Sequence, residues 1–339
     1  MKNTSPVELH KAQFRSIKPT MRWDEHTPLD QWRVACREKL KDILGLHTFS
    51  ICDPDITMQG EDIVNGNRRI RFLVQTEVGY YVNCHLLLPI EMPNKKLPLC
   101  TCLQGHVSGA HLTVGIAKFE HDDVYIDHEC DFGVQAVKKG FAALAIEQRA
   151  FGENGGNTKH GWTECQHAAM VANLMGRSLI GERVWDVQRV IDAVLDRFSD
   201  ILTMEGSILL GESGGGTATY YTACLEDRFS LYMPIVALCT FADSIVDISH
   251  CVCNYVPHVA KRFDMGDMAA MIAPKKMVVV SATEDEWFPL IGAERAFEQV
   301  KRIYRAAGAE DNCAMVVGEG PHRFYAGLAW PVVHEMLNR

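Results

Sequence analysis

Ser213 has the residue type and the sequence surroundings of a catalytic nucleophile. It is the central residue of Gly-Glu-Ser-Gly-Gly (211–215), after the apolar run 206–211 and before 217–225, a stretch of helical character. The pattern G-x-S-x-G alone is weak evidence, because glycine and serine are common residues. A strand before it and a helix after it are, however, the setting of a nucleophile elbow. We therefore predict a reactive serine here, with an inert glycine-rich turn as the alternative.

An acid and a histidine follow in the order that such a serine requires. A serine hydroxyl is activated by a base, usually a histidine that a carboxylate orients. Asp285 follows the apolar run 276–282, and His322 follows the run 312–318. We predict that Ser213, Asp285 and His322 form a catalytic triad. The competing residues are Glu284, Glu286 and Asp243 for the acid and His334 for the base.

A third strand end is expected to complete the site. The run 97–103 is followed by Gln104-Gly105-His106, and a glycine there lets the backbone approach a substrate closely. We predict an oxyanion hole from the N–H groups of His106 and Gly214, next to Gly105, with an ordinary turn as the alternative. Residues beside these loops are expected to form the pocket walls: Trp287, Phe288, Phe151, Gln104 and His106.

The elements that must position these residues follow from the apolar pattern. Residues 69–90 form two β-rich segments around Val78-Gly79, which predicts an antiparallel hairpin. Short runs that are apolar on both sides predict buried parallel strands; they are 97–103, 141–147, 206–211, 231–238, 276–282 and 312–318. Apolar positions from 184 to 198 predict a helix between two of them. The fold class is therefore α/β, with a mostly parallel sheet and antiparallel strands at one edge.

The N-terminal residues are expected to form a separate extension. Trp32, Ala35, Leu40 and Leu44 recur at roughly helical spacing, which predicts an amphipathic helix lying on the main body. We divide the chain into an N-terminal helical extension, 1–48, and a catalytic domain, 49–339.

Composition excludes some partners. The net charge of −9 argues against nucleic acids and anionic membrane surfaces. The N-terminal sequence has no apolar core of signal-peptide length, and no stretch approaches the length of a membrane span. We therefore expect a cytoplasmic protein whose twelve cysteines are mostly reduced and buried.

Together these segments resemble the α/β-hydrolase superfamily, in particular its acetyl xylan esterase / dienelactone hydrolase-like branch. The similarity covers most of the chain from about residue 70, and includes AIEQRAFGENGG (145–156), the block 250–289 and GPHRFY (320–325). It implies helices on both faces of the sheet and hydrolysis of carboxylic esters, often of small acyl groups such as acetate on sugars. It implies no cofactor and a small-molecule ester as the partner; relatives are often oligomeric, and the sequence leaves the oligomeric state open.

Four positions depart from the pattern of the branch. Glu147 replaces an expected Asp, Ala150 an expected Gly, Gln104 a common His, and His258 a common Gly. These departures concern the pocket and its entrance more than the triad. They therefore bear on the identity of the substrate and not on the class of reaction. Dienelactone hydrolases use a cysteine nucleophile, so Ser213 favours the esterase side.

Three alternatives stay open. A peptidase or amidase could use the same scaffold, although we find no long N-terminal β-repeat domain of the kind that gates peptides. A non-catalytic binding protein would normally lack a triad residue, and none is missing here. Two segments rich in potential metal ligands, 120–131 and 250–258, are interpreted as loops near the site. The C-x-C spacing in the second is awkward for zinc, so no metal is predicted.

Overall fold

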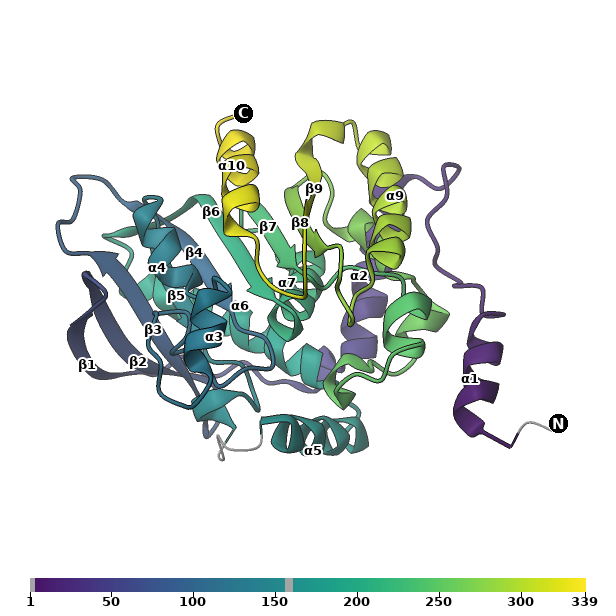
Figure 1. The fold of residues 1–339 in the computed structure, drawn as a ribbon, viewed down its shortest axis with the longest axis horizontal. Coiled ribbons are helices and arrows are strands. Elements are labelled where there is room, and N and C mark those ends of the chain that lie inside the picture. The colour runs from purple at the N-terminus through teal and green to yellow at the C-terminus, as the bar shows by residue number, and fades with distance from the viewer. Residues whose placement is uncertain (1–3, 156–160) are drawn as a thin grey trace.

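The computed structural model describes residues 4–155 and 161–339, and these contain one nine-stranded sheet (Figure 1). Its strand order is β1-β2-β3-β5-β4-β6-β7-β8-β9. The strands are β1 (Ile56–Val64), β2 (Asn67–Glu77), β3 (Tyr80–Pro89), β4 (Leu97–Leu103), β5 (Ala142–Ile146), β6 (Leu202–Glu212), β7 (Leu231–Ile235), β8 (Lys276–Ala282) and β9 (Cys313–Gly318).

The direction of the strands confirms the predicted fold class. β1, β2 and β3 pair antiparallel, and β3 also pairs antiparallel with β5. All pairs from β5 through β4 to β9 are parallel. The six apolar runs and the hairpin correspond to β2–β9. Strand β1 was not predicted, because its residues are mostly exposed and therefore show no apolar alternation.

Helices cover both faces of the sheet (Figure 1). One hydrophobic cluster joins one face of the sheet to α2, α6, α7 and α9, and a second joins the other face to α4 and α10. The α-helices are α1 (Pro6–Phe14), α2 (Leu29–Leu44), α3 (Asp122–Asp127), α4 (Phe132–Lys138), α5 (Gly161–Leu174), α6 (Leu179–Arg197), α7 (Gly214–Leu225), α8 (Met265–Met268), α9 (Leu290–Ala306) and α10 (Ala326–Leu337).

The N-terminal helices differ in how they contact the body. Helix α2 buries Trp32, Cys36, Leu40 and Leu44. Ala35, which was predicted to belong to the buried face of this helix, is exposed, and Cys36 takes its place there. Helix α1 buries no residue. An ion pair ties its C-terminal end to the body, since Nη2 of Arg15 lies 2.7 Å from Oδ1 of Asp247. The division of the chain at residue 48 stays a prediction.

Close packing of α7 on the sheet leads to a test of stability. A Cβ atom added at Gly216 would lie 2.6 Å from both Cβ of Ala237 and the carbonyl oxygen of Ile235. Because neither neighbour is the end of a flexible side chain, we expect Gly216→Ala to lower the free energy of unfolding by roughly 1–3 kcal/mol. Chemical denaturation measures this change.

Gly327 provides the matched control for this substitution. It lies in α10, and a Cβ atom there would meet no atom within 4 Å. Alanine is the better helix former, so Gly327→Ala is expected to leave stability unchanged or to raise it slightly. Equal effects of the two substitutions would contradict the packing argument.

Candidate active site

Ser213 lies at a sharp turn between β6 and α7. Its backbone has φ 54° and ψ −117°, a conformation that costs energy for a residue with a side chain. Two hydrogen bonds hold the turn: the Ser213 N–H donates to the carbonyl of Ile235 at 2.9 Å, and the Thr217 N–H donates to the carbonyl of Ser213 at 2.8 Å. The sequence around Ser213 therefore folds as the predicted strand, turn and helix.

Asp285 and His322 are paired at the ends of β8 and β9. Nδ1 of His322 lies 2.9 Å from each carboxylate oxygen of Asp285. Oδ1 of Asp285 also accepts the backbone N–H groups of Trp287 and Phe288 at 2.8 Å, so the carboxylate has a fixed orientation. The Asp285 side chain is fully buried, whereas His322 keeps 18 % of its side-chain exposure. Among the described residues, Nε2 of His322 has no hydrogen-bond partner.

The competing acids and the competing base lie elsewhere. Glu284 and Glu286 are exposed, and the carboxylate of Asp243 binds Nη1 of Arg295 at 2.9 Å. His334 is exposed on α10 and lines a separate cavity with Trp330.

The loop after β4 packs directly against the turn at Ser213. A Cβ atom at Gly105 would lie 2.9 Å from the Glu212 carbonyl oxygen and 3.0 Å from Cβ of Ser213. A Cβ atom at Gly214 would lie 2.8 Å from Nδ1 of His106. Both positions therefore need glycine, and the two backbone segments predicted to form the oxyanion hole are in close contact.

These elements surround a cavity of about 250 Å³. Ser213, His322, Gly105, His106, Trp287 and Phe288, all predicted for the site, line it. The other lining residues are Val107, Tyr125, His128, Cys130, Glu212, His250, Cys251 and Asn254. The sequence indicated six of them only as members of the segments 120–131 and 250–258, which were expected to be loops near the site, and Glu212 only by its place directly before the serine.

Two predicted pocket residues lie behind this cavity and do not line it. Phe151 is 2 % exposed, and its ring packs edge-on against His106 with the centroids 4.6 Å apart. Gln104 is also 2 % exposed, and its amide donates to Oγ1 of Thr113 at 2.7 Å and to the carbonyl of Cys130 at 2.8 Å. Both side chains support the loop that carries His106.

Two departures from the family pattern coincide with left-handed backbone. Ala150 has φ 62° and His258 has φ 67°. Glycine adopts positive φ without strain, which explains why it is usual at both positions in the branch. Ala150 and His258 therefore adopt a backbone conformation that glycine reaches without strain.

The acidic segment 120–131 stabilises the loop that precedes it, through hydrogen bonds to Asp122. Asp122 is 1 % exposed, and its carboxylate accepts the Lys118 and Phe119 N–H groups at 2.8 and 2.9 Å. Nε2 of His111 lies 2.8 Å from the same carboxylate, and the Ser108 hydroxyl donates to it. Asp122 therefore ties the loop after β4 to α3.

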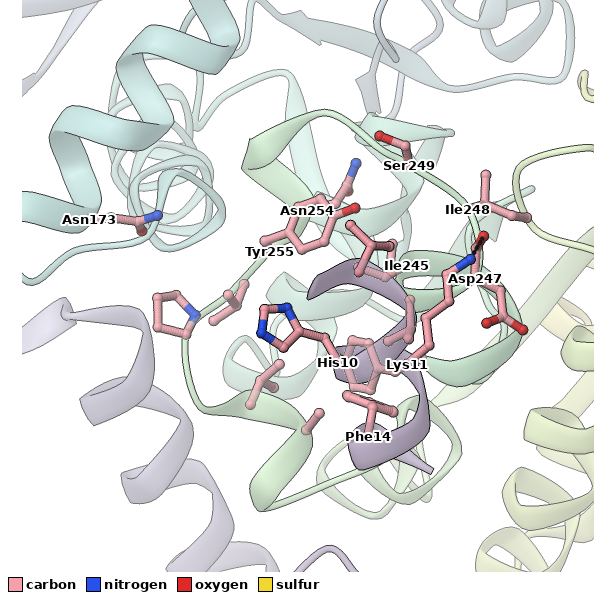
Figure 2. A pocket seen from close by; sticks show the side chains of 17 residues that line it. His10, Lys11, Phe14, Asn173, Ile245, Asp247, Ile248, Ser249, Asn254 and Tyr255 are labelled. Atoms are coloured by element: carbon pink, nitrogen blue, oxygen red, sulfur yellow. Dashed lines mark hydrogen bonds between the residues drawn. The ribbon is translucent and has the colours of Figure 1, made fainter. Parts of the chain in front are cut away.

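A larger cavity of about 720 Å³ lies between α1 and the segment 241–260 (Figure 2). Figure 2 shows His10, Lys11 and Phe14 of α1 beside the side chains of that segment, with Lys11 extending toward Asp247, whose carbonyl oxygen accepts a hydrogen bond from its ammonium group at 3.1 Å. Asn254 lines this cavity as well as the one beside Ser213, so the two cavities share a wall.

Burial of Glu147, directly after β5, makes stability depend on pH. Its carboxylate accepts the Ala110 N–H at 2.9 Å, and its other oxygen has no partner among the described residues. Burial raises the pKa of Glu147 from 4.5 to about 7. The native state thus binds this proton more tightly than the unfolded chain does, so the free energy of unfolding falls as pH rises from about 4.5 to above 7.

Glu147→Gln is expected to remove this fall in the free energy of unfolding with rising pH, because glutamine does not titrate. Relative to wild type, the variant should gain about 3 kcal/mol in the free energy of unfolding between pH 4 and pH 8.5. Denaturation curves at both pH values measure the gain, and Glu91→Gln, at an exposed position, is the control. Parallel pH dependence of wild type and the Glu147 variant would contradict a raised pKa.

Comparisons with known proteins agree with this architecture. No model of a protein family matches the chain. A curated Bacillus subtilis (strain 168) protein named "Putative hydrolase YtaP" is 27 % identical over 199 residues, which span 57 % of this chain and 62 % of that protein. This chain thus matches less than two thirds of the length of that relative.

Solved structures are similar over nearly the whole chain. A structure from Bacteroides fragilis NCTC 9343, described as a "putative acetyl xylan esterase", has a TM-score of 0.77 at 16 % identity, covering 93 % of this chain and 83 % of its own. A glucuronoyl esterase from Solibacter usitatus has a TM-score of 0.68 at 13 % identity, covering 96 % and 98 %. In the described residues no helix is long and apolar enough to cross a bilayer. The sheet order, the turn at Ser213 and these neighbours agree with the resemblance seen in the sequence: the chain has the α/β-hydrolase fold.

Proposed function

We propose that the protein hydrolyses carboxylic esters with small acyl groups, with Ser213 as nucleophile, His322 as base and Asp285 as the acid that orients it. One observation carries the proposal: the Asp285–His322 pair and the strained turn at Ser213 meet at the same cavity. Because Asp285 binds Nδ1 of His322, we assign the proton to that nitrogen, which leaves Nε2 as the basic atom of a residue that lines the cavity.

The proposed reaction proceeds in two halves. Oγ of Ser213 attacks the acyl carbon while Nε2 of His322 accepts the hydroxyl proton, and the resulting imidazolium is stabilised by the Asp285 carboxylate. Collapse of the tetrahedral intermediate transfers this proton to the leaving alcohol. Water then attacks the acyl-enzyme, again giving a proton to His322, and the acid departs as Ser213 regains its hydrogen. This sequence requires no cofactor.

The oxyanion is proposed to bind the N–H groups of Gly214 and His106. The Gly214 N–H lies at the N-terminus of α7, where the helix dipole favours negative charge. The close approach of the Gly105 loop to Ser213 supports the N–H of His106 as the second donor. Loss of one such donor typically costs 100- to 1,000-fold in kcat.

The size and lining of the cavity favour small esters. Its volume of about 250 Å³ lies just below the roughly 300–1,000 Å³ of pockets for drug-sized ligands. Trp287 and Phe288 supply apolar surface, while Tyr125, His128 and His250 supply groups that can bind the oxygen atoms of an alcohol moiety. The names of the structural neighbours, which are esterases, support an ester rather than an amide as substrate.

Ser213→Ala is expected to abolish reaction with a fluorophosphonate probe and to lower kcat on p-nitrophenyl acetate to the background rate, because no other group supplies the attacking oxygen. Ser249, which lines the larger cavity, is the matched control, and Ser249→Ala should label as wild type does. Labelling and intact mass identify the modified chain. Equal labelling of wild type and Ser213→Ala, or none of wild type, would refute the nucleophile.

Asp285→Asn is expected to lower kcat roughly ten-thousand-fold with little change in KM. The asparagine oxygen can still accept the two backbone N–H groups, but its amide would face Nδ1 of His322 and favour the wrong tautomer. Steady-state kinetics with the acetate ester measure this effect. In the wild type, the same assay with acetate, butyrate and octanoate esters is expected to show kcat/KM falling as the acyl chain lengthens. A loss of less than tenfold would exclude Asp285 as the orienting acid.

A further inference from the structure

Four side chains of types that commonly bind metals converge at one wall of the cavity beside Ser213. They are His106 from the loop after β4, Cys165 of α5, Cys251 directly before the short helix η5 (Val252–Asn254), and Cys253 within that helix. Their ligand atoms all lie within 4.8 Å of one another, and the described residues contain no second group of this kind. The three cysteines are 0, 4 and 2 % exposed. The proposed ester hydrolysis uses none of the three thiols.

Three of the separations are close to the edges of a zinc tetrahedron. With Zn–S bonds near 2.3 Å and Zn–N bonds near 2.0–2.1 Å, sulfur atoms lie about 3.8 Å apart, and sulfur and nitrogen about 3.6 Å apart. Sγ of Cys165 lies 3.5 Å from Sγ of Cys251 and 3.6 Å from Nε2 of His106. Sγ of Cys253 lies 3.2 Å from the same Nε2. These three separations lie within about 0.4 Å of the tetrahedral values, and the other three are at most 4.8 Å.

A buried cation next to the cluster indicates that the cluster is anionic. Arg183 is 1 % exposed, and its Nη2 donates to Sγ of Cys165 at 3.2 Å. Its guanidinium also donates to the Arg149 carbonyl and lies 4.0 Å from the centroid of the Phe151 ring. None of these partners is a carboxylate, yet a buried charge requires compensation. Zn²⁺ with three thiolates and one neutral imidazole carries a net charge of −1, which Arg183 balances.

We propose that His106, Cys165, Cys251 and Cys253 bind one structural Zn²⁺ ion. Binding releases the three thiol protons to solvent, and the four protein ligands leave no open position for water or substrate. The ion would join the loop after β4, α5 and the segment 251–253. Two ligands, His106 and Cys251, also line the cavity beside Ser213, so the ion would fix one wall of the candidate active site.

The sequence segment 250–258 alone did not predict this site. Cys251 and Cys253 are too close in sequence to form a zinc site with the neighbouring histidines. Nε2 of His250 lies instead 3.1 Å from the carbonyl oxygen of Trp287. The other two ligands come from residues 106 and 165, which only folding brings to the two cysteines.

Elemental analysis of the purified full chain tests the proposal. Wild type from zinc-supplemented cultures, dialysed without chelator, is expected to hold about one zinc per chain. Cys253→Ala should hold less than about a tenth of that amount. The matched control is Cys224→Ala, another buried cysteine, which should bind zinc as wild type does. His106→Cys, which keeps four ligands, should also retain zinc, whereas His106→Ala should lose it.

Cobalt substitution supplies a readout that a merely structural role of the cysteines would not give. With Co²⁺, wild type should show the visible bands of a tetrahedral ion and near-ultraviolet sulfur-to-cobalt charge transfer, and Cys253→Ala should not. Wild type without zinc, zinc retained by Cys253→Ala, or a Cys165–Cys251 disulfide found by thiol counting would each overturn the proposal. Metal content does not depend on turnover, so loss of the proposed esterase function would leave this test unaffected.

Discussion

The structure of the site depends on the backbone turn that passes from β6 into α7 at one residue. Ser213 is held at positive φ by hydrogen bonds to β7 and to the first turn of α7. Because this turn leaves no room for side chains on neighbouring backbone, Gly105 and Gly214 face each other across it. The same close packing that strains Ser213 therefore brings the loop after β4 next to the nucleophile.

The parallel part of the sheet places the remaining groups. β8 and β9 end at the same edge as β6, so the residues that follow them, Asp285 and His322, lie beside the turn. The carboxylate of Asp285 accepts two backbone N–H groups in addition to binding His322, and these hydrogen bonds fix its orientation. Preorganisation of this kind removes the need to rearrange charges during a reaction.

The residues that line the cavity are held in place by other side chains packed behind them. His106 contributes backbone to the proposed oxyanion hole, while its ring points to three buried cysteines and packs on Phe151. Residues that line the cavity are thus supported by side chains such as Phe151, Cys165 and Cys253, which do not line it. The sequence could suggest Phe151 and Gln104 as neighbours of the site, but it could not separate the residues that line the cavity from those that support them, because both lie on the same loops.

What the sequence determined by itself was local. Apolar runs predicted six of the nine strands, and the β-rich segments around Val78-Gly79 predicted two more. The order of Ser213, Asp285 and His322 along these runs predicted a triad, and the structure places Ser213 and His322 at one cavity. Strand β1 was missed, since an exposed strand shows no burial pattern. Only the tertiary structure decided that Cys165 and His106 join Cys251 and Cys253. Burial and turns follow from neighbouring residues, whereas contacts between distant segments depend on how helices and loops pack on the sheet.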